Sequence, residues 1–282
     1  MQKTLSALKD KITNALIVDR ENHIYRCHRS IFTDPQLFDF EMKHIFEGNW
    51  VFLAHESQIA EPGDYYTLTL GRQPVIITRD KKNDLHALIN SCAHRGAMLC
   101  RRKTGNKNSF TCPFHGWTFS NNGKLLKAKD ESTGAYPDTF KQEGSHDLQK
   151  LPRFQSYRGF LFGSLNADVQ SLEAYLGETR KTIDLIVDQA PDDLEEFSAC
   201  QRGYLGENLP WSDLSRGALR WVDGPDEHAK HAGFTPRLSG VKSEDEALYI
   251  AHHHHWQTVM LAALEQEQQR YDQSITQRVE VA

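Results

Sequence analysis

The 282-residue sequence has no apolar run long enough to cross a lipid bilayer, so it predicts no membrane-spanning helix. It also lacks an excess of basic residues, because 33 Lys and Arg stand against 38 Asp and Glu, for a net charge of −5. This balance does not indicate a basic surface for binding nucleic acid or an anionic membrane. Residues 1–5 do not lead into the apolar core of a secretory signal. We therefore expect a cytoplasmic protein with no nucleic-acid or membrane partner.

Cysteine is scarce, with five residues in the chain. Cys92 and Cys112 belong to a motif described below, which leaves Cys27, Cys100 and Cys200. An odd remainder in a chain without a secretory signal argues against a disulfide framework. We therefore expect reduced thiols, with Cys100 packed rather than bridged.

The composition is that of an ordinary globular protein, with 39% apolar and 25% charged residues. At this length the chain can form one large domain or two small ones, each with a real core. Apolar periodicity is helical near the start, strand-like in the middle and helical again toward the end. We expect an α+β fold: an N-terminal helical segment (1–40), a mostly β domain (41–166), and a shortened, mainly helical C-terminal part (167–282).

Individual elements follow from the same patterns. Helices are predicted over residues 4–18, 35–50, 171–187, 192–204 and 243–271, the last with Ser243 in a capping box. Strand-like runs occupy residues 51–53, 65–68, 75–78, 85–89 and 160–165. Asn121-Asn122-Gly123 predicts a hairpin turn.

Residues 92–115 carry the strongest chemical signal. Cys92-Ala93-His94 is followed, after residues 95–111, by Cys112-Pro113-Phe114-His115. Such Cys-x-His and Cys-x-x-His pairs are the ligand set of a Rieske [2Fe–2S] centre, in which two thiolates hold one iron and two imidazoles the other. Because neutral imidazole puts less negative charge on the cluster, the reduction potential rises from about −400 mV to between about −150 and +300 mV. The motif predicts an electron-transfer centre ligated by Cys92, His94, Cys112 and His115.

A zinc site is the alternative, since two cysteines and two histidines also suit tetrahedral zinc. Zinc fingers usually keep the cysteines as one pair and the histidines as another, whereas each pair here mixes the two ligand types. Gly96 and Gly116 follow the ligand pairs where a loop needs a positive φ or a close backbone approach, and Pro113 stiffens the second loop. Residues 117–119 read as a strand. These features favour the iron–sulfur centre and leave a zinc-bound interaction module as the alternative.

Histidines also cluster outside this motif. His252-His253-His254-His255 lie inside the helix predicted over 243–271. Adjacent helical residues point about 100° apart, so the four cannot ligate one metal. His228 and His231 have the i, i+3 spacing of one helix face. Together they form a candidate divalent-metal patch, although solvated or packing histidines are the expectation.

The sequence around the motif resembles a known family. Long matching stretches include TCPFHGWTF at 111–119 and YRGFLFGSL at 157–165. Others are residues 37–43, 45–50, 53–59, 71–74, 94–97, 123–127, 144–148, 192–197, 215–218 and 238–242. With these segments the chain resembles the large (alpha) subunits of ring-hydroxylating dioxygenases, above all those of benzoate and toluate 1,2-dioxygenases.

The resemblance implies both an activity and partners. Members of this family carry out O₂-dependent cis-dihydroxylation of an aromatic carboxylate. The resemblance also implies electrons from an NADH-dependent flavin/iron–sulfur reductase, and an oligomer built with beta subunits and other alpha subunits.

A second iron site of the family is incomplete in this sequence. The family holds a mononuclear Fe(II) with two histidines and one carboxylate, which leaves positions open for O₂. The Asn-Gly-x-Asp-Gly-Tyr-His-x₄-His type segment that supplies the histidines in the family does not occur here. We interpret the junction near residues 189–191 as an internal deletion. Asp193 resembles the family's carboxylate region and is either a leftover ligand or a surface acid at a helix start.

The missing histidines change the expected function. Dihydroxylation needs activated oxygen, whereas a Rieske centre only stores and forwards one electron. We therefore expect the chain to retain electron transfer and to be unable to turn over an aromatic acid alone, and we assign it no catalytic residue. The alternatives are a stand-alone Rieske electron carrier or a non-catalytic subunit of an oxygenase assembly.

Overall fold

The computed structural model describes residues 2–19, 24–134, 136–141, 144, 146–188 and 244–280. The chain divides into two compact units, one formed by Met1–Ile45 with Gln201–Ala282 and the other by Phe46–Cys200. No helix among the described residues is long and apolar enough to cross a membrane. The helix predicted over 192–204 lies outside the described residues, as do Asp193, His228 and His231.

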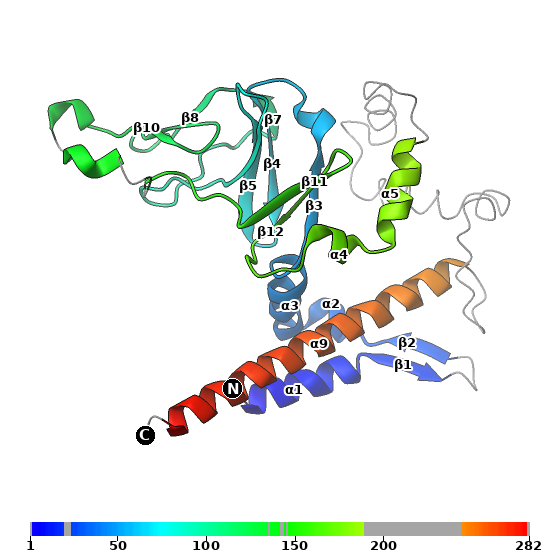
Figure 1. The fold of residues 1–282 in the computed structure, drawn as a ribbon. Helices are drawn as coiled ribbons and strands as arrows, with labels where there is room; N and C mark the ends of the chain where they lie inside the picture. Colours follow the sequence, from blue (N-terminus) through cyan, green and yellow to red (C-terminus); the bar gives the residue numbers. More distant parts are fainter. Residues whose placement is uncertain are drawn as a thin grey trace. The chain divides into compact units, whose positions relative to one another are not determined.

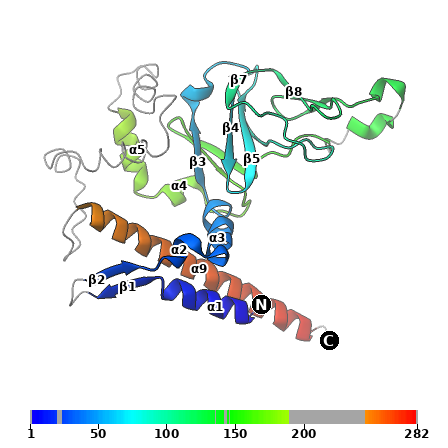
Figure 2. The same cartoon turned by 180° about the vertical axis from the view of Figure 1, so that it is seen from behind.

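The first unit is built on two helices that run side by side (Figures 1 and 2). These are α1 (Gln2–Thr13) and α9 (Glu244–Glu280), with α3 (Pro35–Glu41) packed against α1. Apolar side chains three or four residues apart share one helix face, which accounts for the shared core. The buried members of this core are Leu5, Leu8, Ile12, Leu37, Phe40, Met260, Ala263 and Leu264.

The helix predicted over residues 4–18 is wrong in its last part. α1 ends at Thr13, and β1 (Leu16–Asp19) pairs antiparallel with β2 (Ile24–Cys27). Two of the four β1 residues are β-branched, which favours a pleated backbone. The main-chain N–H of His28 also bonds to the carbonyl of Ala15 at 2.7 Å. A partner strand several residues away therefore overrides the helical spacing of Leu16.

The helices predicted over residues 35–50 and 243–271 are both present, with different ends. Asp34 caps α3 by accepting the N–H groups of Gln36 and Leu37, and Pro35 occupies the first turn. α2 (Ser30–Thr33) precedes α3, and a π-helix, η1 (Met42–Phe46), continues it, so the predicted end at residue 50 is four residues too late. α9 confirms the C-terminal helix and runs nine residues past the predicted end at 271. Its predicted N-cap, Ser243, lies outside the described residues.

The second unit is mostly β, as predicted. Its four-stranded antiparallel sheet has the order β6 (Leu85–Ile89), β5 (Gln73–Arg79), β4 (Asp64–Leu70), β7 (Thr104–Asn106). A three-stranded sheet has the order β11 (Arg153–Tyr157), β12 (Phe160–Ser164), β3 (Val51–His55). A small sheet has the order β10 (Leu125–Lys127), β9 (Thr118–Ser120), β8 (Ser109–Thr111), and lies to the left of β4 and β5 in Figure 1. Each strand-like run in the sequence therefore forms a strand.

Strand β5 is buried on both faces. Val75, Ile76 and Ile77 all have 0% exposure, although neighbouring strand residues point to opposite sides. Val75 and Ile77 belong to the largest core cluster, while Ile76 packs with Cys100 and other residues of a second cluster. A strand held from both sides makes a rigid support for the loops beside it.

The helix predicted over residues 171–187 is broken into two. α4 (Leu172–Leu176), capped by Ser171, and α5 (Thr179–Asp188) are separated at Gly177, whose φ is +48°. Such a φ suits glycine and ends the first helix. The described part of this unit also contains the short helices η2 (Glu56–Ile59), η3 (Glu131–Thr133) and η4 (Asp138–Lys141).

Candidate iron–sulfur centre

Two loops of the β unit carry the predicted ligands. The first connects β6 to β7 and contains Cys92 and His94, while the second connects β8 to β9 and contains Cys112 and His115. The cysteines are buried, with 3% and 2% exposure, and the histidines are half-buried. Each loop therefore places its thiol inside and its imidazole nearer the surface.

The two loops share one backbone pattern. In each, the cysteine N–H bonds to the carbonyl five residues later, and the glycine four residues later donates back to the cysteine carbonyl. The four distances are Cys92 to Ala97 2.8 Å, Gly96 to Cys92 2.8 Å, Cys112 to Trp117 2.7 Å, and Gly116 to Cys112 3.0 Å. Two copies of one tight turn thus present the two ligand pairs.

Of the two reasons that the sequence gives for glycine in these turns, the structure shows the positive φ. Gly96 has φ +73° and Gly116 has φ +68°. A Cβ on Gly116 would meet nothing within 4 Å, and on Gly96 it would meet only Ser91 Oγ at 3.6 Å. Backbone conformation, not crowding, therefore requires glycine at both positions.

The two thiols lie together. Burial raises the pKa of Cys92, main-chain N–H groups of His94 and Arg95 oppose this shift, and the neighbouring Cys112 thiol adds to it. Both cysteines are free thiols. Donors aimed at a sulfur stabilise its thiolate, which is the form that binds metal.

The two imidazoles also lie together. The rings of His94 and His115 are 4.7 Å apart between centroids and nearly perpendicular, at 87°. The buried Nδ1 of His94 has no hydrogen-bond partner among the described residues. Burial lowers the pKa of His94, and the His115 and Arg95 charges lower it further. A neutral imidazole with an unpaired buried nitrogen fits a metal ligand, because such a nitrogen is otherwise costly to bury.

Trp117 fixes the ring of His94. The two rings stack with centroids 4.9 Å apart and planes at 15°. Trp117 in turn contacts Phe140 edge-on at 5.7 Å, and Phe140 lies against His146 at 3.9 Å. This aromatic packing sets the direction of the His94 nitrogens.

Asn90 is a site residue that sequence reasoning missed. Its side chain is buried and forms three hydrogen bonds across the first loop. The Oδ1 atom accepts the N–H groups of Leu99 at 3.1 Å and Cys100 at 2.9 Å, and Nδ2 donates to the Cys100 carbonyl at 2.7 Å. The sequence signal is weak: a polar residue directly after an apolar strand, two positions before Cys92.

Asn121 has a related role at the second loop. Its Nδ2 donates to the Arg79 carbonyl at 3.1 Å, and its own carbonyl accepts the Thr78 hydroxyl at 2.5 Å. At the other end of β5, the Asn90 N–H bonds to the Pro74 carbonyl at 2.8 Å. Asn121 begins the predicted Asn-Asn-Gly turn, which does join β9 to β10. Both ligand loops are thus tied to β5.

The remaining candidate ligands form no further centre in the described part of the chain. No group of three or more His, Cys, Asp or Glu residues there is placed to hold a single metal ion. A tetrahedral zinc site needs such a group, whereas a two-iron cluster takes two protein ligands per iron. Of the histidine run, His253 packs against Phe32 with ring centroids 6.2 Å apart. Cys27 and Cys100 are free thiols as expected, and Cys200 lies outside the described residues.

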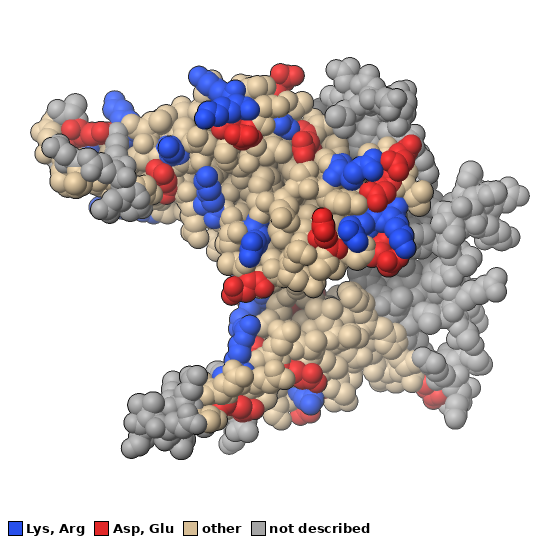
Figure 3. Space-filling view, in the orientation of Figure 1, with Lys and Arg blue, Asp and Glu red and all other residues tan. Residues whose placement is uncertain are grey.

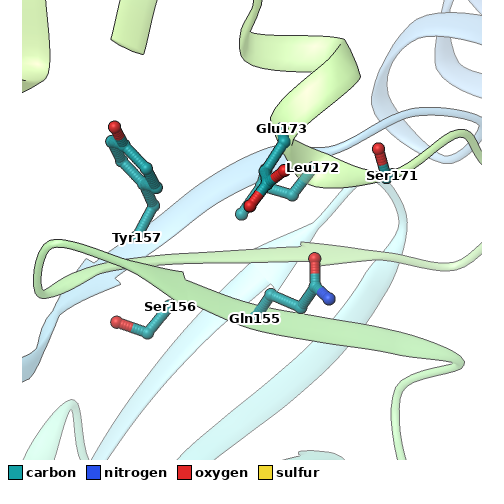
Figure 4. A pocket seen from close by; sticks show the side chains of 6 residues that line it. All are labelled: Gln155, Ser156, Tyr157, Ser171, Leu172 and Glu173. Atoms are coloured by element: carbon teal, nitrogen blue, oxygen red, sulfur yellow. The ribbon is translucent and has the colours of Figure 1, made fainter.

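A hollow of about 250 Å³ lies elsewhere, between β11 and α4 (Figure 4). Its lining consists of Gln155, Ser156, Tyr157, Ser171, Leu172 and Glu173. The Tyr157 hydroxyl donates to Asp184 at 2.9 Å and is therefore engaged in packing α5. With no cysteine or histidine in its wall, the hollow adds no ligand to the centre.

Comparison with known proteins identifies the β unit. The model of the Rieske [2Fe-2S] domain family matches residues 49–152, which include all four predicted ligands. Toluate 1,2-dioxygenase subunit alpha of Pseudomonas putida is 35% identical, with 96% of this chain and 98% of that protein covered. The 2-halobenzoate 1,2-dioxygenase large subunit of Burkholderia cepacia is 33% identical, with 98% and 97% covered.

The solved structures match a smaller part. Naphthalene 1,2-dioxygenase from Rhodococcus sp., bound to indole, has 34% identity and a TM-score of 0.54 over 67% of this chain and 41% of that chain. The alignment with the toluate enzyme runs over 449 positions although this chain has 282 residues. The relative thus contains a long stretch with no counterpart here. By sequence, domain and fold, the chain belongs to the alpha subunits of aromatic-ring-hydroxylating Rieske dioxygenases, of the toluate and halobenzoate 1,2-dioxygenase type.

Proposed function

We propose that Cys92 and Cys112 hold one iron of a [2Fe–2S] cluster and that His94 and His115 hold the other. The observation that carries this assignment is the pair of matching turns, which bring two buried thiols together and two imidazoles together. The unpaired buried Nδ1 of His94 supports it, because a metal bond would satisfy that atom. When bound, the cluster supplies one-electron transfer at a potential above that of all-cysteine clusters.

The surrounding residues prepare this site. Burial raises the pKa of the Cys92 thiol, and the main-chain N–H groups of His94 and Arg95 act against that shift. Trp117 holds the His94 ring in one plane and keeps water from one of its faces. Leu88, Phe119 and Leu148 belong to the apolar cluster that buries both cysteines. Together these contacts orient the ligands before any metal arrives.

We further propose that this chain keeps the electron-transfer half of its family's chemistry and lacks the oxygen-activating half. Its sequence has no counterpart of the segment that supplies the two iron-binding histidines in the family. Within the described residues, no group of three ligands replaces them. The residues that the structure describes therefore do not fit a mononuclear Fe(II).

The expected partners follow from this role. An NADH-dependent flavin/iron–sulfur reductase in the cytoplasm supplies the electron. Intact alpha subunits and beta subunits of a benzoate-type or toluate-type oxygenase are the proposed assembly partners, and an aromatic carboxylate is the proposed substrate of that assembly.

Spectroscopy tests the cluster assignment. The purified chain, reconstituted anaerobically with iron and sulfide, should show visible absorption and, once reduced, the low-temperature paramagnetic resonance of a Rieske cluster. Bound zinc in the chain as isolated, with neither signal after reconstitution, would contradict the assignment and favour the interaction module.

Turnover tests the proposed loss of oxygen chemistry. The reconstituted chain is supplied with reductase, NADH and benzoate or toluate, without an intact alpha subunit. We expect cluster reduction but no cis-dihydrodiol. Product formation under these conditions would contradict the proposal, and an intact toluate dioxygenase with the same reductase serves as the positive control.

A further inference from the structure

We propose that the basic surface around the ligand loops is the docking site of an acidic electron-donor protein. This inference deepens the proposed function and rests on it, because it assigns the partner of the same cluster. It follows from how charge is distributed along the chain and over the surface.

Charge is strongly segregated around the ligand motif. Residues 85–129 contain no Asp or Glu, although the whole chain has 38. The same segment, called the basic segment here, contains eight Lys and Arg residues. It therefore has a formal charge of +8 within a chain of net charge −5. These residues are Arg95, Arg101, Arg102, Lys103, Lys107, Lys124, Lys127 and Lys129.

All eight basic side chains are exposed. None forms an ion pair with another described residue, and Lys103 instead lies over the Tyr66 ring, 4.9 Å from its centroid. Their charges are thus not neutralised by neighbours within the described parts of the fold.

The surface around α5 is different. There the charges pair: Arg158 contacts Asp188 at 2.6 Å and Asp184 at 3.5 Å, and Lys181 contacts Glu178 at 2.5 Å. Figure 3 shows blue and red atoms intermixed in this region. Mixed and paired charge is the ordinary state of a soluble surface, so the unpaired basic segment is distinctive.

Several of these basic residues lie close to the proposed ligands along the chain. Arg95 follows His94 directly along the chain, and its side chain is exposed. Arg102 and Lys103 leave the first loop, and the Thr67 hydroxyl bonds to the Arg102 carbonyl at 3.0 Å, which ties this stretch to β4. Lys124 and Lys127 lie in the hairpin after the second loop. Along the chain, both ligand loops are therefore followed by cations that form no ion pair among the described residues. The nearby carboxylates of Asp147 and Glu131 instead accept the main-chain N–H groups of Leu125 and Ala128.

Two apolar side chains are exposed within the same loops. Phe114, next to His115, is 66% exposed, and Met98 is 43% exposed. Protein interfaces commonly combine aromatic residues, Met and Arg with a polar rim. An acidic donor protein fits this surface, because complementary charge would steer it to the histidine side of the cluster.

Small redox ions test the charge at the cluster without any protein partner. The reduced, reconstituted chain is oxidised in a stopped-flow instrument by anionic hexacyanoferrate(III) or by cationic tris(phenanthroline)cobalt(III). We expect the rate to fall with ionic strength for the anion and to rise for the cation. The opposite trends, or none, would overturn the basic docking surface while the cluster signal leaves the proposed function standing.

Charge reversal tests the docking itself. The probe is an acidic plant-type ferredoxin, reduced with dithionite and freed of excess reductant. Arg101→Glu/Arg102→Glu should lower the second-order rate of cluster reduction about tenfold at low salt. Lys81→Glu/Lys82→Glu is the matched control: two adjacent exposed bases on the β5–β6 turn, outside the basic segment, expected to change the rate less than twofold.

Cluster resonance spectra of both variants must match the unmodified chain, which separates lost docking from a lost centre. Equal rate losses in the two variants would show an effect of net charge alone and would overturn the proposal. An unchanged rate of reduction by ferredoxin in Arg101→Glu/Arg102→Glu would also overturn the proposal. If the same variant lost binding to phosphatidylserine vesicles or to RNA, the surface would serve that partner instead.

Discussion

The two ligand loops have the same backbone turn but different supports. The first loop is closed by one buried side chain, Asn90, which bonds to main-chain groups at its far end. The second is closed by strand pairing, since β8 and β9 continue directly from it in register, with Thr111 opposite Thr118. The turn therefore sets the geometry of the ligands, whereas the contacts at the base of each loop set its rigidity.

The largest expected effect tests whether the two turns are equivalent. Cys92→Ser and Cys112→Ser should each abolish the cluster, because two thiolates are needed on one iron. Visible absorption and iron content after reconstitution measure the loss. Cys27→Ser, which changes a free thiol of the first unit, is the control and should retain the full signal. A cluster that survives in only one of the two ligand variants would show that the loops are not equivalent.

The next effect tests the difference in support. Asn90→Ala leaves three main-chain groups of the first loop without their partner, and at roughly 1–3 kcal/mol for each unsatisfied buried group we expect about 3 kcal/mol or more of destabilisation.

Asn121→Ala removes one side-chain bond to β5 and should cost about 1 kcal/mol. Urea unfolding and the width of the resonance lines of the reduced cluster measure both. Equal losses in the two variants would contradict the unequal support of the loops.

The glycines give a smaller and symmetrical effect. Gly96→Ala and Gly116→Ala should each cost roughly 1–2 kcal/mol, because both residues have φ near +70° and neither site is crowded. The free energy of unfolding of the two variants is compared directly. A difference of several kcal/mol between them would argue against a shared turn.

The smallest effect concerns the side chains at the base of the second loop. Thr111 and Thr118 share a hydroxyl–hydroxyl bond of 3.0 Å in an exposed position. Thr111→Val should change the free energy of unfolding by no more than about 0.5 kcal/mol, since the strand pairing persists. A much larger loss would place the support of this loop in the hydroxyl pair and not in the strands.

Predictions from the sequence are correct where an element depends on residues close to it along the chain, and wrong where it depends on a distant partner or an unusual backbone angle. The strand-like runs predicted in the β unit and the Asn-Asn-Gly turn are confirmed because apolar runs and turn residues act locally. Strands β7, β8, β10 and β11 were not predicted. The helix predicted over residues 4–18 is wrong at its end because β1 pairs with β2. The single helix predicted over 171–187 is wrong because Gly177 adopts a positive φ and divides it.

Sequence reasoning went less far at the candidate site. The ligand set remains a prediction from residue type and spacing. Asn90 was missed because its partners lie nine and ten residues away and are main-chain atoms, which carry no residue-specific signal.

The attachment of both loops to β5 keeps the support of the ligand site within one short part of the chain. The contacts described above that tie the two ligand loops together lie between Pro74 and Leu148, from the Pro74 and Arg79 carbonyls to the aromatic packing on Trp117. None of them uses the stretch that the toluate relative has and this chain lacks. The support of the ligand loops therefore comes from the β unit itself, from strand β5 and the aromatic cluster around Trp117.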